Sequence, residues 1–169
     1  IRDRGRVVEW TDDGEPRRAV GIHIDVTEEK ERERDLERYR RIVDELPESV
    51  CTYDANGRFA LVNDHLAEVY DAAPEGLAGE PSRLVERVRA ASDGDPWRAL
   101  VEGDRDSLTG TTEVDLPTKS DAIVDYDFSR LVIDGELDGV LGISRDVTEQ
   151  RRRQRRLERT SARLEALFE

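Results

Sequence analysis

An internal repeat constrains the fold of this chain more than any other feature of its sequence. The segment 21–28, Gly-Ile-His-Ile-Asp-Val-Thr-Glu, recurs at 142–149 as Gly-Ile-Ser-Arg-Asp-Val-Thr-Glu, an offset of 121 residues. Identities at the same offset continue in the charged stretch after each copy and in the Asp-Gly-Glu turn before it. A repeat at one domain length indicates tandem copies of one structural unit.

The end of each copy predicts a β-hairpin that leads directly into a charged helix. Alternating apolar residues flank a glycine turn at 7–24 and again at 124–143, which is typical of paired strands. At the first junction, Asp25 or Thr27 is expected to accept hydrogen bonds from the free N–H groups of the first helical turn. Asp146 or Thr148 has the same role at the second junction. We therefore expect each junction to couple a strand rigidly to a helix.

Each of these helices carries an apolar stripe that is typical of a short coiled coil. In the first helix its spacings are three, four and three residues, and its members, here called the seam, are Leu36, Tyr39, Val43 and Leu46. The second helix starts with five Arg and one Gln and then repeats the stripe with Leu157, Thr160, Leu164 and Leu167. Because an isolated helix of this kind is marginal in water, we expect a homodimer through the seam.

The residues between the two junctions predict one complete unit. Period-two patterns predict five strands, at 50–54, 59–63, 111–116, 123–133 and 137–145. Capping and breaking residues predict three short helices, at 64–70, 82–91 and 96–102, with a Gly- and Pro-rich break at 71–81. The order of these elements favours an α+β fold, with a five-stranded antiparallel sheet that short helices cover on one face.

The repeat also predicts how the chain is divided. We expect residues 1–28 to be the last hairpin of a preceding unit, 29–47 a linker or coiled-coil helix, 48–149 the complete domain and 150–169 a C-terminal helix. The chain starts with Ile and contains no Met, which indicates a piece of a longer protein.

The charge and composition of the chain exclude several partners. With 27 basic and 40 acidic residues the formal charge is −13, which repels phosphate backbones and anionic headgroups, so we expect neither nucleic acid nor membrane contact. The Arg-rich run at 151–156 is interpreted as a solvated helix flank. A lone cysteine, Cys51, and the lack of a membrane-length apolar run indicate a cytoplasmic protein. Its acidic composition with only two lysines resembles proteins of a high-salt cytoplasm.

Three stretches of the complete unit together resemble a PAS domain. They are Tyr-Asp-Ala-Asn-Gly-Arg-Phe-Ala-Leu-Val-Asn at 53–63, Gly-Leu-Ala-Gly at 76–79, and the hairpin that ends in the PAC-type motif Asp-Val-Thr-Glu at 146–149. The resemblance implies a sheet that cups a small cavity, dimerisation through flanking helices, and transmission to a downstream effector domain in the same parent chain. Such arrays occur in haloarchaeal sensor histidine kinases of two-component systems and in bacterio-opsin-activator-like regulators, and nothing in the sequence chooses between them.

Strand alternation places a set of side chains on the face that the helices would cover. We expect a ligand cavity lined by Cys51, Tyr53, Leu66, Leu84, Val85, Val88, Val114, Tyr126, Phe128, Val140, Gly142 and Ser144. The alternative, that these side chains fill a core without a ligand, stays open. Trp97 likewise either packs over the cavity mouth or anchors its helix. The ligand expected for such a cavity is small and hydrophobic or aromatic.

Two cofactors of the superfamily do not fit the residues present. Its flavin-binding light sensors carry Gly-x-Asn-Cys-Arg-Phe-Leu-Gln, where this chain has Gly-Glu-Pro-Ser-Arg-Leu-Val-Glu at 79–86, so Ser82 replaces the thiol that forms the flavin adduct. Haem needs an axial donor, and neither His23 nor His65 lies near 97–104, where haem PAS domains have theirs. The separated His and Cys residues also give no metal-ligand spacing.

The sequence therefore favours a sensory and signal-relay module over an enzyme. No Ser/His/Asp or Cys/His set, phosphate-binding Gly loop or kinase phosphoacceptor motif is recognisable in it. In this interpretation the sheet passes a change in packing or ligand occupancy through Asp146 and Thr148 to the helix that follows. A purely structural dimerisation spacer without a ligand is the alternative that the sequence leaves open.

Overall fold

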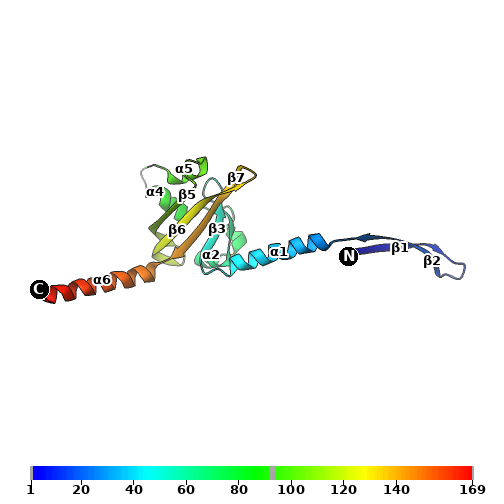
Figure 1. Ribbon diagram of the computed structural model, residues 1–169, viewed down its shortest axis with the longest axis horizontal. Helices are drawn as coiled ribbons and strands as arrows, with labels where there is room; N and C mark the ends of the chain where they lie inside the picture. Colours follow the sequence, from blue (N-terminus) through cyan, green and yellow to red (C-terminus); the bar gives the residue numbers. More distant parts are fainter. Residues whose placement is uncertain (1, 92–93, 169) are drawn as a thin grey trace. The chain divides into compact units, whose positions relative to one another are not determined.

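The computed structural model describes residues 2–91 and 94–168, with side chains at 4–22, 24–91 and 94–161. Its packing divides the chain into two units, 1–42 and 43–169. In the first unit, strands β1 (Arg2–Trp10) and β2 (Pro16–Ile24) pair as an antiparallel hairpin, coloured blue in Figure 1. Helix α1 (Thr27–Asp44) follows and continues into the second unit. A hairpin thus leads into a helix at the first of the two repeated junctions.

The second unit is built on a five-stranded antiparallel sheet with the strand order β4-β3-β7-β6-β5. Its strands are β3 (Ser49–Tyr53), β4 (Phe59–Val62), β5 (Ser107–Leu116), β6 (Lys119–Ile133) and β7 (Glu136–Asp146). β3 pairs with β7 at the centre of the sheet, in the register Cys51 with Gly142. The predicted α+β fold class is confirmed. β7 ends directly before α6 (Thr148–Phe168), the orange to red helix in Figure 1.

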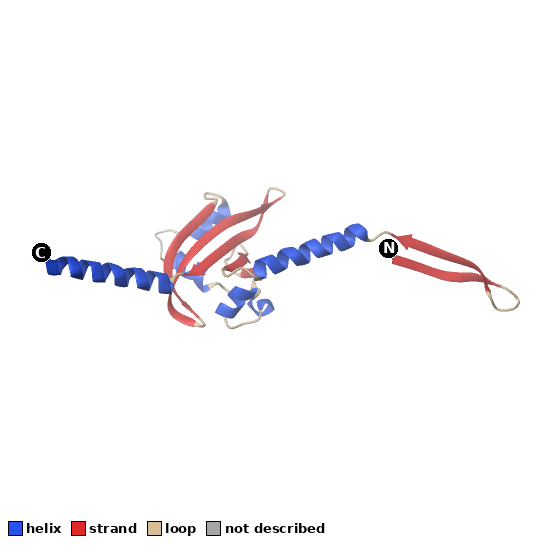
Figure 2. Cartoon of the chain, turned by 60° about the horizontal axis from the view of Figure 1, so that its bottom comes forward, coloured by secondary structure: helices blue, strands red, loops and turns tan. Residues whose placement is uncertain are grey.

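Four short helices connect β4 to β5 and pack on one face of the sheet, as the blue ribbons beside the red strands in Figure 2 show. They are α2 (Asp64–Val69), α3 (Pro74–Leu77), α4 (Arg83–Ala90) and α5 (Pro96–Glu102). Three of them start at a side-chain cap, because Asn63, Ser82 and Asp95 each accept a hydrogen bond from an N–H group of the first turn.

Three local features differ from the sequence-based expectation, and one of them is that β5 starts at Ser107 rather than at 111. Helix α3 lies inside the stretch 71–81 that was expected to be only a break, and Pro74 at its first turn explains why it forms there. β6 starts at Lys119 rather than at 123, and its pairing with β5 begins at Leu116. The first residues of β6 are mostly polar, and an antiparallel strand tolerates polar residues where it is open to solvent.

The core of the second unit is an aromatic cluster between the sheet and helix α5. The ring of Tyr53 stacks on that of Phe59 and contacts Trp97 and Phe128 edge to face, with ring centroids 5.3–5.7 Å apart. Trp97 is fully buried, and its Nε1 donates a hydrogen bond of 2.9 Å to the carbonyl of Ala55. Of the two roles considered for Trp97, the structure shows the anchor.

Candidate functional site

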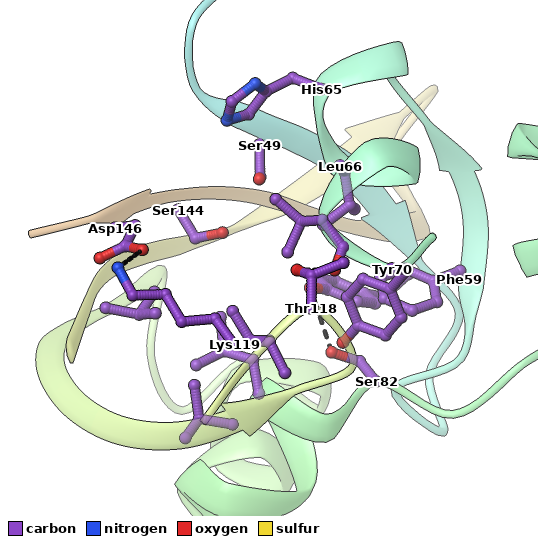
Figure 3. Close-up of a pocket in the computed structure, with 16 residues that line it drawn as sticks. Ser49, Phe59, His65, Leu66, Tyr70, Ser82, Thr118, Lys119, Ser144 and Asp146 are labelled. Carbon is purple, nitrogen blue, oxygen red and sulfur yellow. Dashed lines mark hydrogen bonds and ion pairs between the residues drawn. The ribbon is translucent and has the colours of Figure 1, made fainter. Parts of the chain in front are cut away.

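A pocket of about 70 Å³ lies between the sheet and helices α2 and α4 (Figure 3). This volume is several times the ~10–15 Å³ that one water needs and far below the ~300–1,000 Å³ of sites for drug-sized ligands. Figure 3 shows Lys119 and Asp146 at one end and Tyr70 and Ser82 at the other. The lining consists of Ser49, Tyr53, Phe59, His65, Leu66, Val69, Tyr70, Ser82, Leu84, Val114, Leu116, Thr118, Lys119, Val124, Ser144 and Asp146.

The structure divides the twelve cavity residues expected from the sequence into two groups. Five of them line the pocket: Tyr53, Leu66, Leu84, Val114 and Ser144. The other seven lie outside its lining, around the aromatic cluster or beside it: Cys51, Val85, Val88, Tyr126, Phe128, Val140 and Gly142. Strand alternation identifies the face that turns inward, but it does not show which part of that face the ring of Trp97 fills.

Several pocket residues were not expected from the sequence, and Lys119 matters most among them. Lys119 is one of only two lysines in the chain, and it follows the turn between β5 and β6. In the same turn, Thr118 donates a hydrogen bond of 2.7 Å to the carbonyl of Val69 in α2. The turn is therefore fastened to the helical side of the pocket. The rarity of lysine was the one feature of the sequence that could have drawn attention to Lys119. No sequence spacing predicts that residue 119 lies next to residue 146.

The rim of the pocket holds an ion pair between Lys119 and Asp146. Nζ of Lys119 lies 2.6 Å from Oδ2 of Asp146, and the two side chains are 35% and 38% exposed. Burial by itself acts to raise the pKa of Asp146, but hydrogen bonds from Lys119 and Thr148 outweigh it, so the pKa lies below its usual value. The carboxylate is thus held ionised at the point where the sheet ends.

The backbone carbonyl and N–H of one residue at the edge of the pocket, Ile123, both form hydrogen bonds with residues at the start of α6. The N–H of Val147 donates to the carbonyl of Ile123 at 2.8 Å. The N–H of Ile123 donates to Oγ1 of the fully buried Thr148 at 2.9 Å. Oδ1 of Asp146 accepts from the Thr148 N–H at 2.8 Å and from the Thr148 hydroxyl. Because the neighbouring Val124 lines the pocket, the pocket wall and the helix start are adjacent along β6.

The first junction repeats the cap in simpler form. Oδ1 of Asp25 accepts a hydrogen bond of 2.9 Å from the N–H of Thr27, as Asp146 does from Thr148. Hydrogen bonds from the Thr27 side chain and backbone hold the pKa of Asp25 below its usual value. The repeated sequence therefore forms the same local structure twice.

A family profile described as the PAS fold matches residues 43–152, and so includes the sheet, the pocket and the start of α6. The chain belongs to the PAS family. Both the pocket and the second junction lie inside the PAS domain, and the first junction lies before it.

Individual relatives agree with this assignment. The two-component sensor PprA of Pseudomonas aeruginosa is 32% identical over 153 residues, which are 85% of this chain and 16% of that protein. The chain thus spans only about a sixth of the length of this curated relative. The PAS domain of an HTR-like protein from Haloarcula marismortui is 20% identical with a TM-score of 0.55, over 72% of this chain and 99% of that one. The PAS domain of BvgS from Bordetella pertussis is 21% identical with a TM-score of 0.50, over 76% and 98%.

The side chain of Asn63 joins the N-terminal end of the PAS domain to α2, the helix that covers the pocket. Its buried amide Nδ2 donates to the carbonyls of Val43 and Glu48, at 3.1 and 2.9 Å. Its Oδ1 accepts from the N–H groups of Val50 and Leu66, at 3.0 and 3.1 Å. The end of α1, the start of β3 and the first turn of α2 therefore share one side chain. The sequence gives only the capping part of this role, because the other partners are distant along the chain.

The buried hydroxyl and thiol groups of the PAS domain are neutral near pH 7. Burial raises the pKa of Cys51 to about 12, and burial also raises the pKa of Tyr53 well above its usual value. Ser82, which caps α4, donates a hydrogen bond of 3.4 Å to the Tyr53 hydroxyl. Cys51 is therefore a packed side chain and not a nucleophile. In the described parts of the chain no group of three or more His, Cys, Asp and Glu residues could hold a metal ion.

The seam residues are exposed on the helix that enters the PAS domain. Leu36 is 69% and Tyr39 65% exposed, and Val43 and Leu46 are each 37% exposed. α1 ends at Asp44, so Leu46 lies in the turn beyond the helix. In the second stripe Leu157 is also exposed, whereas the side chains of Leu164 and Leu167 lie outside the described residues.

Within the described residues, no helix is long and apolar enough to cross a membrane.

Proposed function

We propose that this PAS domain is a sensory and signal-relay module. A change in pocket occupancy or in sheet packing alters the start of α6, and α6 passes the change to an effector domain of the same parent chain. The observation that carries the proposal is the double hydrogen bonding of Ile123 to Val147 and Thr148, next to the pocket residue Val124. A displacement of β6 reaches the first turn of α6 with no flexible segment between them.

The proposal includes a homodimer in the cytoplasm, with no enzymatic activity in this segment. A dimer through the exposed seam on α1 would place two copies of the domain together, so that a change at the start of α6 shifts the pair of α6 helices between two arrangements. The likeness to a two-component sensor supports an effector in the same chain, with a histidine kinase or a transcription regulator as the candidate types. The pocket residues form no nucleophile–base pair, which supports a binding role over a catalytic one.

A structural dimerisation spacer is the second candidate, and the tight core favours it. Trp97, Phe128 and Val140 are fully buried, and the pocket that remains is only about 70 Å³. Native mass spectrometry of the purified protein, with analysis of the small molecules it releases, separates the two candidates. A sensor with a tightly bound ligand releases a defined molecule in stoichiometric amount, whereas a spacer releases none.

The relay is tested by removing the side chains that connect the sheet to α6. In the double variant Asp146→Ala and Thr148→Ala, we expect faster amide hydrogen exchange in the first two turns of α6 and a sheet that stays folded, because each lost cap costs about 0.5–2 kcal/mol. The matched control is Asp25→Ala with Thr27→Ala, which removes the same chemistry from the first junction. It should affect α1 and leave α6 as it is. Unchanged protection of the α6 turns in the first variant would contradict the relay.

A further inference from the structure

Lys119 has hydrogen-bonding capacity at the pocket that the folded domain does not use. An ammonium group carries three donors, and the partner of Nζ among the described residues is one oxygen, Oδ2 of Asp146. The other lysine, Lys30, lies in α1 and outside the pocket lining. The pocket rim therefore offers spare donors that carry a positive charge.

The acceptors at the same rim are largely occupied. Oδ1 of Asp146 accepts two hydrogen bonds from Thr148, and Oδ2 accepts one from Lys119. The Asp146 carboxylate has about four acceptor sites, so one site on Oδ2 is left for a cationic group, whereas an anionic ligand can use the two free donors of Lys119. The balance of donors and acceptors thus favours a negatively charged head group.

The rest of the pocket sets the size and the polarity of the remainder of the ligand. Its interior wall is mostly apolar, with Tyr53, Phe59, Leu66, Leu84 and Val124 all buried, and the buried Ser49 and Ser82 add two polar groups to it. A volume of about 70 Å³ accommodates only a short chain or small ring. The net charge of −13 slows the approach of an anion, but beyond roughly 10 Å salt screens this repulsion, so the local contact with Lys119 decides binding.

We propose that the pocket binds a small organic carboxylate, whose head group hydrogen-bonds to Nζ of Lys119 and whose apolar body lies against the buried wall. The head group uses the spare donors of Lys119 and therefore shares its positive charge with Asp146. Binding thereby weakens the link between the β5–β6 turn and the residue that caps α6. This consequence at α6 rests on the proposed function, whereas the binding of a carboxylate does not.

Two lysines in the chain make a direct test practical. In protein labelled with ¹³C-lysine, the Cε signals of Lys119 and Lys30 are followed by NMR while butyrate or butyramide is added. The two probes have nearly the same shape and differ in charge. We expect butyrate to shift the Lys119 signal and not the Lys30 signal, and butyramide to bind at least tenfold more weakly, as expected for the loss of a charge-assisted hydrogen bond.

Two variants complete the test. Lys119→Gln should weaken butyrate binding roughly tenfold or more, while Lys30→Gln should leave it unchanged. Equal binding of butyrate and butyramide, unaltered butyrate binding by Lys119→Gln, or no shift of Lys119 with butyrate in the millimolar range would overturn the proposal. Amide exchange in α6 with bound butyrate separates the two proposals. A bound carboxylate with unchanged exchange contradicts the relay alone, and an altered exchange with equal binding of both probes contradicts the carboxylate alone.

Discussion

At the scale of residues, Thr148 and Asp146 explain how a strand end becomes a helix start. The hydroxyl of Thr148 donates to Asp146 and accepts from the N–H of Ile123, so one buried group joins the cap to β6. The sequence predicted the cap from the residue types alone. It did not predict the bond to Ile123 or the ion pair with Lys119, because both depend on strand pairing across more than twenty residues.

The lowered pKa of Asp146 predicts a pH dependence of stability. A carboxyl whose pKa is lower in the folded than in the unfolded state stabilises the fold above its unfolded pKa of about 3.9 and loses this effect as the pH falls through the folded value. Asp146→Asn should therefore cost about 1 kcal/mol near neutral pH, where the partly exposed pair contributes modestly, and progressively less below about pH 4. Urea unfolding of both proteins across this range measures the difference. A difference that stays constant into acid would show that the charge of Asp146 is not the cause.

At the scale of elements, β7 contains a glycine, Gly142, whose missing side chain leaves room for the rings of the aromatic cluster. A Cβ on Gly142 would lie 2.5 Å from Cε2 of Tyr53 and 3.2 Å from Sγ of Cys51. Both neighbours are buried and cannot move away without disturbing the core.

Gly142→Ala is therefore expected to lower the free energy of unfolding by about 1–3 kcal/mol, as overpacking of a core does. Chemical denaturation followed by tryptophan fluorescence measures this, since Trp97 lies in the same cluster. Gly76→Ala is the matched control, because a Cβ there meets no atom within 4 Å. A loss of the same size in both variants would show that glycine content, and not the contact with Tyr53, matters.

The elements themselves could largely be predicted from the sequence, for physical reasons that differ between them. β3 alternates cleanly between buried and half-buried residues because one face is buried, and α5 is marked by Asp95, Pro96 and the left-handed Gly103 at its ends. α3 was missed because its four residues carry no periodic pattern. The start of β6 was missed because its first residues are polar and partly exposed. Local signals fail where an element is short or open to solvent.

At the scale of the whole molecule, the repeat and the PAS motifs identified the family, whereas only five of the sixteen pocket-lining residues were predicted. Alternation found the inward face, and so it found Tyr53 and Ser144 in the pocket lining. It could not find Lys119 or the four-bond role of Asn63, since those side chains gain their partners only when distant segments meet.

The seam predicts how two copies of the chain associate. Sedimentation of the protein in high salt should show a dimer. Leu36→Asp with Tyr39→Asp should raise the dimer dissociation constant at least tenfold, because each buried apolar side chain contributes about 1.5–3 kcal/mol. Leu61→Asp is the control, as Leu61 is 72% exposed on β4. A monomeric wild type, or dissociation caused by Leu61→Asp instead, would contradict an interface at the seam.

The most direct measurement of the relay is amide exchange in α6 after the pocket is filled from its helical wall. Val69→Phe adds volume to the pocket from α2, far along the chain from α6. We expect faster exchange at 148–155 in this variant, and no further acceleration when Val69→Phe is made in a Thr148→Val background, which lacks the hydroxyl that bonds Ile123. Equal acceleration in both backgrounds, or none in a folded Val69→Phe protein, would show that the pocket does not reach α6 through this junction.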